Sequence, residues 1–553
     1  MKLKSLTLAL AGVVGISPVA MAFDVPVEAD PDGNRRVRVT QQQITSGELT
    51  LQEIRLIGRE MFATPFNKSD GFGETPGDTP ESRRTLGNRG SLQGNGTFTR
   101  INGLDAQTCA ECHAVGSSAV VPFRFIVGGA GTMNDTVLGG GGASFININD
   151  DANQINPPAD FPAAVTTGQS NINGRTINPP IVFGSGGVEL VGNEMTQDLQ
   201  ALAASVIGTP NATVDLVTKD VNFGTLSTDA DGAIVDADAD GNADGVVGID
   251  ATIGGKAFLV VQPFGRKGNN ITTRTFDTDA LQFHHGMQPV EVLAGLSSVE
   301  NGVDTPSDDE IAALIADAAT QNPDGDNVVN EVTVGELSAM NVFSAMLERP
   351  VQEEPEGRAA VGEQLFADSG CVECHVPSFQ TNSRTLGVRF PEILQDPSAN
   401  VYMNLDLTKK PVKFEKSGPG IIVRPFGDFK RHKMGTDLAE FDGNDSFETA
   451  RLWGVADSAP YLHDGRALTL MDAILIHGNS PGSQAADAVD NFEALTSEDQ
   501  QAVISFLKTL KNPNSASKDL DRLARRIAHD DDDDSSHNGR DDDSDDDDRG
   551  RGR

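Results

Sequence analysis

The stretch QTCAECHAVG, at residues 107–116, contains a C-x-x-C-H motif, and SGCVECHVPS, at residues 369–378, contains it again. The chain has 553 residues and only 4 cysteines, so the two motifs hold all of them: Cys109, Cys112, Cys371 and Cys374. A histidine follows each pair directly, as His113 and His375. The two stretches therefore require a chemistry that uses two thiols and the next imidazole together.

Three kinds of cysteine chemistry compete for this pattern. Disulfides would close only two-residue loops, which stabilise a large chain little. A zinc site built from the four thiolates would leave the two histidines unexplained. Covalent haem attachment uses all three residues, because the thiols form thioethers with the haem vinyl groups and the histidine ligates the iron. The motifs therefore predict two covalently bound haem c groups, with His113 and His375 as iron ligands.

The first residues predict export. The stretch MKLKSLTLALAGVVGISPVAMAFD has two lysines, a short apolar run and a small-residue cleavage site that ends at Ala22. This pattern is typical of a signal peptide over residues 1–22 and predicts a periplasmic or secreted protein. No later segment is apolar for long enough to span a bilayer, so we expect no transmembrane segment.

The net charge of −38 argues against nucleic acid as a partner. Part of this charge lies in residues 516–553, which include the run AHDDDDDSSHNGRDDDSDDDDRGRGR. A segment with so little to bury is expected to be a disordered acidic tail.

A weak internal repeat divides the rest of the chain. The hexapeptides IGREMF (57–62) and VGEQLF (361–366) each lie on a helical pattern upstream of one motif, and each half ends in an amphipathic helix, in ELSAMNVFSAMLERP and TSEDQQAVISFLKTLKNP. We therefore predict a mainly α fold with two cytochrome c-like haem domains, at residues 23–350 and 351–515. Residues from about 125 to 255 are rich in Gly, Asn and Pro and predict an insertion of loops and short strands in the first domain.

Within this insertion, DADADGNADGVVG resembles the opening of an EF-hand loop. The candidate Ca²⁺ ligands are Asp236, Asp238, Asp240, Asn242 and Asp244. The position where a glutamate would close such a loop is Val247, so a polar turn without an ion is the alternative interpretation.

The sixth iron ligand separates electron transfer from chemistry at the iron. Thr469 can cap a helix on which Leu470, Ala473, Ile474 and His477 share one face. His477 is therefore a candidate metal ligand, against the alternative of an ordinary core histidine.

At this segment the chain resembles a family. APYLHDGRALTLMDAILIHG (459–478), with two C-x-x-C-H motifs upstream, resembles the bacterial dihaem cytochrome c peroxidase superfamily. The dihaem oxidoreductase branch, whose members are classed as peroxidases, is the most similar; MauG and the rubber oxygenase RoxA are more distant. In the peroxidases a Met ligand stands where this chain has His477, which puts the ligand in doubt and leaves Met434 as the alternative. His463 matches a histidine that the family uses structurally.

The resemblance also nominates residues at the N-terminal haem. GMQPVEVLAG resembles the family's NPxEMG segment, which implies that Glu291 moves protons during O–O cleavage. His284 and His285, in QFHHGM, are candidates for a second acid–base group or a sixth ligand. The family's tryptophan between the haems has no counterpart in the first half, and the single tryptophan of this chain is Trp453.

The resemblance implies a dihaem c-type oxidoreductase of the peroxidase kind. Electrons would pass from a C-terminal electron-transfer haem to an N-terminal catalytic haem that reduces hydrogen peroxide or a related small-molecule oxidant. The donor would be a small redox protein such as a monohaem cytochrome or a cupredoxin, and the acidity of this chain would attract a basic one. Two alternatives stay open: a dihaem oxygenase or oxidase acting on an organic substrate, and a non-catalytic dihaem electron carrier.

Overall fold

The computed structural model describes residues 38–63, 66, 70–71, 109, 113, 135–138, 172–175, 178–239, 242–251, 258–285, 287–296, 306–322, 328–439 and 444–513. The predicted signal peptide, Cys112, Asp240 and the acidic tail lie outside these residues. None of the helices described is long and apolar enough to cross a membrane.

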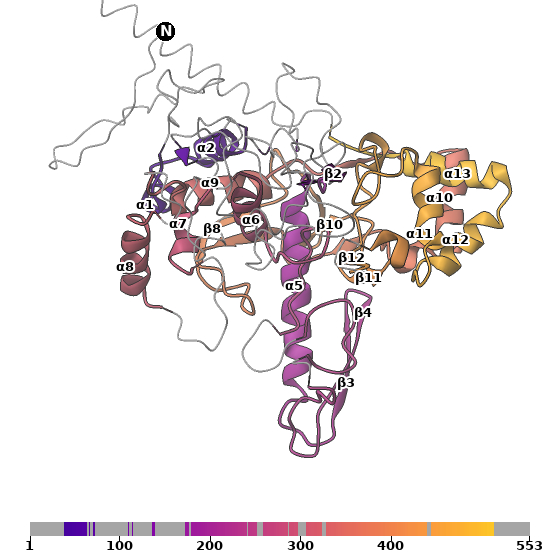
Figure 1. Cartoon of the computed structure of the whole chain (residues 1–553), viewed down its shortest axis with the longest axis horizontal. Coiled ribbons are helices and arrows are strands. Elements are labelled where there is room, and N and C mark those ends of the chain that lie inside the picture. Colours follow the sequence, from indigo (N-terminus) through magenta and orange to yellow (C-terminus); the bar gives the residue numbers. More distant parts are fainter. Residues whose placement is uncertain are drawn as a thin grey trace, which may run out of the picture.

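The helices fall into two groups along the chain (Figure 1). The first group is α1 (Gln41–Thr45), α2 (Leu51–Ala63), α5 (Ser185–Ala204), α6 (Thr273–His285), α7 (Val290–Leu293), α8 (Asp308–Ala318) and α9 (Val334–Ala345). The second is α10 (Arg358–Asp368), α11 (Leu470–Asn479), α12 (Ala486–Glu493) and α13 (Ser497–Leu507). Short 3₁₀ turns occur at η4 (Cys371–Glu373), η5 (Thr436–Leu438) and η6 (Val455–Asp457).

The strands are short, and the pairs between them are antiparallel. A three-stranded sheet has the order β6 (Phe379–Gln380), β10 (Gly420–Val423), β9 (Glu415–Ser417). The two-stranded pairs are β1 (Asp135–Leu138) with β2 (Ile172–Arg175), β3 (Thr213–Thr218) with β4 (Val221–Ser227), β7 (Thr385–Arg389) with β8 (Val401–Asp406), β11 (Arg431–Lys433) with β12 (Ser446–Glu448), and β5 (Val351–Gln352) with β13 (Leu510–Lys511).

The buried apolar side chains form two clusters that follow the two groups of helices. The larger extends from Val39 to Trp453, and the smaller joins Phe366 and Phe426 to the apolar faces of α11, α12 and α13. The β5–β13 pair brings the two ends of the second unit together. Figure 1 accordingly shows α10–α13 gathered at one end of the molecule, away from α2, α6 and α9.

The internal repeat appears as a helix crossing that occurs twice. A Cβ placed on Gly58 of α2 would lie 2.1 Å from the carbonyl oxygen of Ala339 in α9, and one on Gly362 of α10 would lie 1.9 Å from that of Ala502 in α13. At such contact only glycine lets the two backbones approach. The helices predicted in ELSAMNVFSAMLERP and TSEDQQAVISFLKTLKNP are confirmed as α9 and α13, and the structure has Thr496 as the cap of α13.

The phenylalanine that ends each of the two similar hexapeptides has equivalent neighbours in the two halves. Phe62 lies 5.5 Å from Phe343 and 6.4 Å from His113, measured between ring centroids. Phe366 lies 5.5 Å from Phe506 and 6.3 Å from His375. Each C-x-x-C-H histidine therefore lies beside the same kind of helix pair, in which one helix precedes the motif in the sequence and the other follows it at a distance.

The longest helix, α5, was not predicted from the sequence. Its first turn, Ser185 to Val188, is buried, and Cβ atoms on Gly186 and Gly187 would meet Ala345 and Phe414 at 2.1 and 2.3 Å. The glycines that suggested a loop are in fact needed for close packing inside a helix. Figure 1 shows α5 running from the body of the molecule into a projection that it forms with β3 and β4.

Candidate haem sites

The C-terminal motif is described almost completely. Cys371 begins η4 directly after α10, and the backbone N–H of His375 donates to the Cys371 carbonyl at 2.9 Å. The ring nitrogen Nδ1 of His375 is 2.9 Å from the carbonyl oxygen of Phe426. A histidine that donates its Nδ1 proton to a carbonyl is fixed in the tautomer that leaves Nε2 available to a metal.

His477 faces His375 in the same tautomer. Thr469 caps α11 as predicted, its hydroxyl accepting from the Asp472 N–H, and Nδ1 of His477 is 2.6 Å from the Ala473 carbonyl. The ring centroids of the two histidines are 6.5 Å apart, with an interplanar angle of 65°. Two imidazoles on opposite sides of one metal ion, each bound at about 2 Å, would have centroids about 6 Å apart. Burial lowers the pKa of both rings, to about 4 for His375, which favours the neutral form that binds iron.

The surroundings of these histidines also suit a porphyrin. Apolar side chains that are only partly buried pack against the smaller core cluster, among them Val372, Tyr461, Ile474 and Leu475. Such side chains offer an apolar wall that a macrocycle would cover. The thiols of Cys371 and Cys374, the paired imidazoles and this wall together fit a covalently attached haem.

A charged pair lies next to the second thiol. Cys374, Asp428 and His432 bring their ligand atoms within 4.8 Å of one another, and Nε2 of His432 is 2.7 Å from Oδ2 of Asp428. Burial alone would lower the pKa of His432, but its hydrogen bonds and charge interactions with Asp428 and Cys374 together outweigh burial and raise the pKa to about 9. His463 lies in the HDG segment and stacks on Phe447 with ring centroids 4.4 Å apart. Met434 follows β11, with its backbone N–H bonded to the carbonyl of Asp445.

The N-terminal motif is described at Cys109 and His113. The His113 ring lies between Phe62 of α2 and Phe276 of α6, each 6.4 Å away between centroids. Nε2 of His285, at the end of α6, is 3.5 Å from Sγ of Cys109. The structure therefore brings His285 to the motif, whereas the side chain of His284 lies outside what is described.

Glu291 is fixed in a buried ion pair. Its carboxylate accepts from the guanidinium of Arg274, with both oxygens 3.2 Å from Nε, and Arg274 also donates to Oγ of Ser338 at 2.9 Å. Burial raises the pKa of Glu291, and the Arg274 guanidinium opposes that rise. Glu291 is thus a carboxyl group held by α6, and α6 also carries His285 and Phe276.

Sequence reasoning missed a group of buried acids around α6. Asp277 follows Phe276, accepts a hydrogen bond from Ser344 at 3.2 Å, and has its pKa raised to about 8 by burial. Burial also raises the pKa of Glu189, and that of Glu392 to about 7. One signal was present: Arg274, Asp277 and Leu281 share a helical face, and Leu281 marks that face as buried.

The acidic loop of the insertion does gather carboxylates. Asp236, Asp238 and Asp244 bring one oxygen each within 4.8 Å of one another, while Val247 is 49% exposed. Asp240 lies outside the described residues, and Asn242 lies in an isolated bridge beside the group. This arrangement supplies oxygen ligands of the kind that Ca²⁺ takes.

Comparison with known proteins supports the predicted resemblance to the dihaem peroxidase superfamily over part of the chain. Residues 327–510 match the family described as "Di-haem oxidoreductase, putative peroxidase". Cytochrome c551 peroxidase of Pseudomonas aeruginosa is 34% identical over 136 residues, which are 24% of this chain and 31% of that protein.

The family match covers residues 327–510, and the chain spans about a third of the length of this curated relative. Among solved structures, hydrazine synthase of Kuenenia stuttgartiensis aligns with 32% of this chain and 55% of its own, at 18% identity and a TM-score of 0.20. A similarity this low bears on neither fold nor function.

Proposed function

We propose that this protein is an exported dihaem c-type oxidoreductase that takes electrons from a small redox protein and reduces hydrogen peroxide or a related oxidant. The observation that carries the proposal is the contrast between the two motifs. His375 faces a second histidine, with ring centroids 6.5 Å apart, whereas the rings of Phe62 and Phe276 lie beside His113, and Nε2 of His285 lies 3.5 Å from the thiol of Cys109. A six-coordinate site suits electron transfer, and an open one suits chemistry.

The proposal gives separate roles to the residues that would hold the two haems and to those that would transfer protons. Cys371 and Cys374 would anchor one haem, with His375 and His477 as axial ligands. Cys109 and Cys112 would anchor the other, with His113 as its proximal ligand. Bound haem would supply the redox chemistry, and the protein must deliver protons beside it. Glu291 of α7, which pairs with Arg274 in the first turn of α6, and His285, the last residue of α6, are the proposed acid–base groups.

Glu291 can exchange a proton only if its contact with Arg274 loosens. The raised pKa favours that exchange, because a buried carboxyl group binds its proton more readily than an exposed one. His285 is the second proposed acid–base group because its Nε2 lies 3.5 Å from Sγ of Cys109, in the N-terminal motif. Trp453, which is 5% exposed and belongs to the larger core cluster, is the proposed aromatic residue on an electron path between the halves.

Spectroscopy of the half-reduced protein tests the proposal. With the C-terminal haem reduced, the remaining ferric haem should be high-spin and should bind cyanide. The His285→Ala variant should retain this signal, whereas a signal that appears only in this variant would identify His285 as a sixth ligand. Two low-spin haems that bind neither cyanide nor peroxide would contradict an enzyme and favour the electron carrier.

We also propose that the Asp236–Asp244 loop binds Ca²⁺. Three carboxylates within 4.8 Å repel one another, so a bound cation should stabilise the β3–β4 projection. Calorimetric titration of the metal-stripped protein with Ca²⁺ should give one binding event that Asp238→Asn weakens. If wild-type protein shows no heat of binding, the loop is a polar turn.

A further inference from the structure

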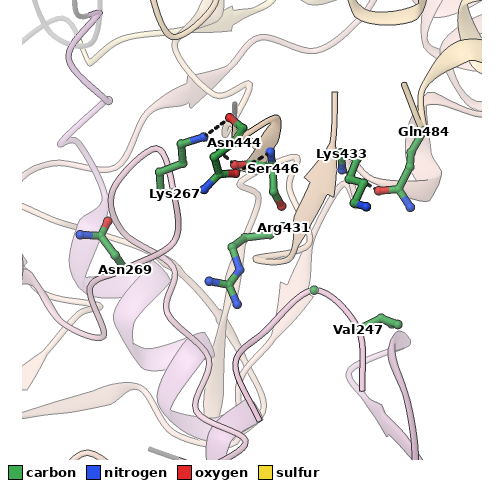
Figure 2. A pocket seen from close by; sticks show the side chains of 9 residues that line it. Val247, Lys267, Asn269, Arg431, Lys433, Asn444, Ser446 and Gln484 are labelled. Atoms are coloured by element: carbon green, nitrogen blue, oxygen red, sulfur yellow. Dashed lines mark hydrogen bonds between the residues drawn. The ribbon is translucent and has the colours of Figure 1, made fainter. Parts of the chain in front are cut away.

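A cavity of about 470 Å³, lined mainly by residues with polar or cationic side chains, lies beside the β11–β12 pair (Figure 2). Three of the nine residues that line it are cationic, Lys267, Arg431 and Lys433, and the others with functional side chains are Asn269, Asn444, Ser446 and Gln484. None of the nine residues is acidic. A basic cavity is unexpected on a chain with a net charge of −38. If the charged residues were spread at random over the surface, acidic residues would line most cavities.

The cations in this cavity are held in different ways. Arg431 pairs bidentately with Asp250, which lies outside the lining and orients the guanidinium. The ammonium of Lys267 donates to the carbonyl oxygens of Asn444 and Ser446, both at 2.9 Å, and lies 3.5 Å from the centroid of the Phe447 ring. Lys433 is exposed, and its ammonium makes no hydrogen bond or ion pair with the described residues.

Strand register explains why two cations point the same way. Successive side chains of a strand alternate between faces, so Arg431 and Lys433 share one face of β11 and His432 takes the other. Lys433 is paired with Ser446 of β12, which also lines the cavity. Gln484 is fixed at the rim because its Oε1 accepts from the Lys433 backbone N–H at 2.7 Å, which leaves its amide N–H groups as donors.

We propose that this cavity is a binding site for a small organic anion with two or more carboxylate groups. Its volume lies within the range of small-molecule pockets, roughly 300–1,000 Å³. Lys433 offers an exposed ammonium and Arg431 a guanidinium that Asp250 holds in place, so two separate cationic groups line the cavity. The side chains of Ser446, Asn269 and Gln484 offer neutral donors. None of the nine lining residues is aromatic, so the cavity has no stacking surface for a nucleotide base.

The cavity lies close to the C-terminal haem attachment site, so an anion bound in it should affect that haem. The opposite face of β11 carries His432, whose ligand atoms lie within 4.8 Å of those of Cys374. An anion on the cavity face would therefore lie one strand away from the C-terminal haem attachment site. Added negative charge stabilises the oxidised state of a nearby iron, so occupancy should lower the reduction potential of that haem. This consequence depends on the proposed function, whereas the binding itself does not.

Calorimetric titration of the full-length holoprotein with succinate tests the binding. Succinate should bind, succinamide of the same shape but without charge should not, and 0.5 M NaCl should weaken the affinity for succinate. Lys433→Glu should weaken it at least tenfold. Lys416→Glu, an exposed lysine on β9 that does not line the cavity, makes the same change in net charge and should leave the affinity within twofold. Asn269→Ala removes a donor without changing charge and should weaken it two- to fivefold.

The outcomes separate the alternatives. No binding of succinate, or equal weakening by Lys433→Glu and Lys416→Glu, would overturn the proposal and leave only a diffuse charge effect. Inorganic phosphate that binds as tightly as succinate would contradict a dicarboxylate site. A redox titration with and without saturating succinate checks the link to the haem. A calorimetric signal without a shift in potential would refute that link, whatever the catalytic assignment of the two haems.

Discussion

The two halves of this molecule pack a pair of helices beside the haem-motif histidine in the same way, but they differ in what lies on the other side of that histidine. In both, a glycine allows two helices to touch through their backbones and a phenylalanine one turn later lies beside the haem-motif histidine, as Gly58 with Phe62 and Gly362 with Phe366. What surrounds that histidine differs. His375 faces His477, whereas His113 faces the aromatic side of α6, whose other groups are an ion pair and buried acids. The helix pair therefore provides the support, and the specialisation comes from the elements opposite it.

The largest effect is expected from removing each pair of thiols in turn, which tests whether both motifs attach a haem. Cys371→Ser with Cys374→Ser, and Cys109→Ser with Cys112→Ser, should each give a protein with one covalent haem where the wild type has two. The pyridine haemochrome spectrum and the intact mass measure the loss. If either double variant retained both haems through acid–acetone extraction, the assignment of that motif would be wrong.

The ion pair of the N-terminal half should be the next most sensitive feature. Glu291→Gln leaves the buried Arg274 guanidinium without its counter-charge, and breaking a buried pair in this way costs about 3–5 kcal/mol. Urea unfolding followed by circular dichroism measures the change in free energy. The matched Arg274→Met/Glu291→Gln variant removes both charges and should recover part of the loss. A Glu291→Gln protein as stable as wild type would show that the carboxyl group is already neutral.

In the C-terminal half, the ligand opposite His375 sets the potential. His477→Met should raise the reduction potential of this haem by on the order of 100 mV, because a thioether stabilises ferrous iron relative to an imidazole. Spectroelectrochemical titration measures the shift. Met434→Leu is the matched control and should leave the potential unchanged. The opposite pattern, a shift with Met434→Leu alone, would make Met434 the ligand.

Features of the fold and the sites could be predicted from the sequence where they depend on contacts between residues close together in the chain. Thr469 and His477 lie on one helix, so capping and the helical period were enough to anticipate their arrangement. The similarity of IGREMF and VGEQLF predicted two equivalent helices, and both formed. The partner of Glu291 could not be predicted, because Arg274 reaches it from another helix. The cationic cavity was missed for the same reason, since Lys267 and Arg431 meet only through the tertiary fold.

The helix crossing itself offers the finest test of the comparison. Alanine usually stabilises a helix relative to glycine by about 0.5–1 kcal/mol. At Gly58 and Gly362 the added Cβ would instead lie 2.1 and 1.9 Å from a backbone carbonyl oxygen. Overpacking of this kind costs about 1–3 kcal/mol, so both alanine variants should be destabilised in spite of the favourable propensity.

The two variants should differ in which haem they disturb. Gly362→Ala should alter the spectrum of the C-terminal haem, since α10 leads directly into Cys371, and Gly58→Ala should alter the other. Gly427→Ala is the control, because its Cβ would have an ordinary contact of 3.4 Å with the Thr449 carbonyl oxygen. Thermal unfolding monitored at the Soret band of each haem measures both effects. If Gly362→Ala lowered the thermal stability while Gly58→Ala did not, the two helix crossings would be similar in geometry but would contribute differently to stability.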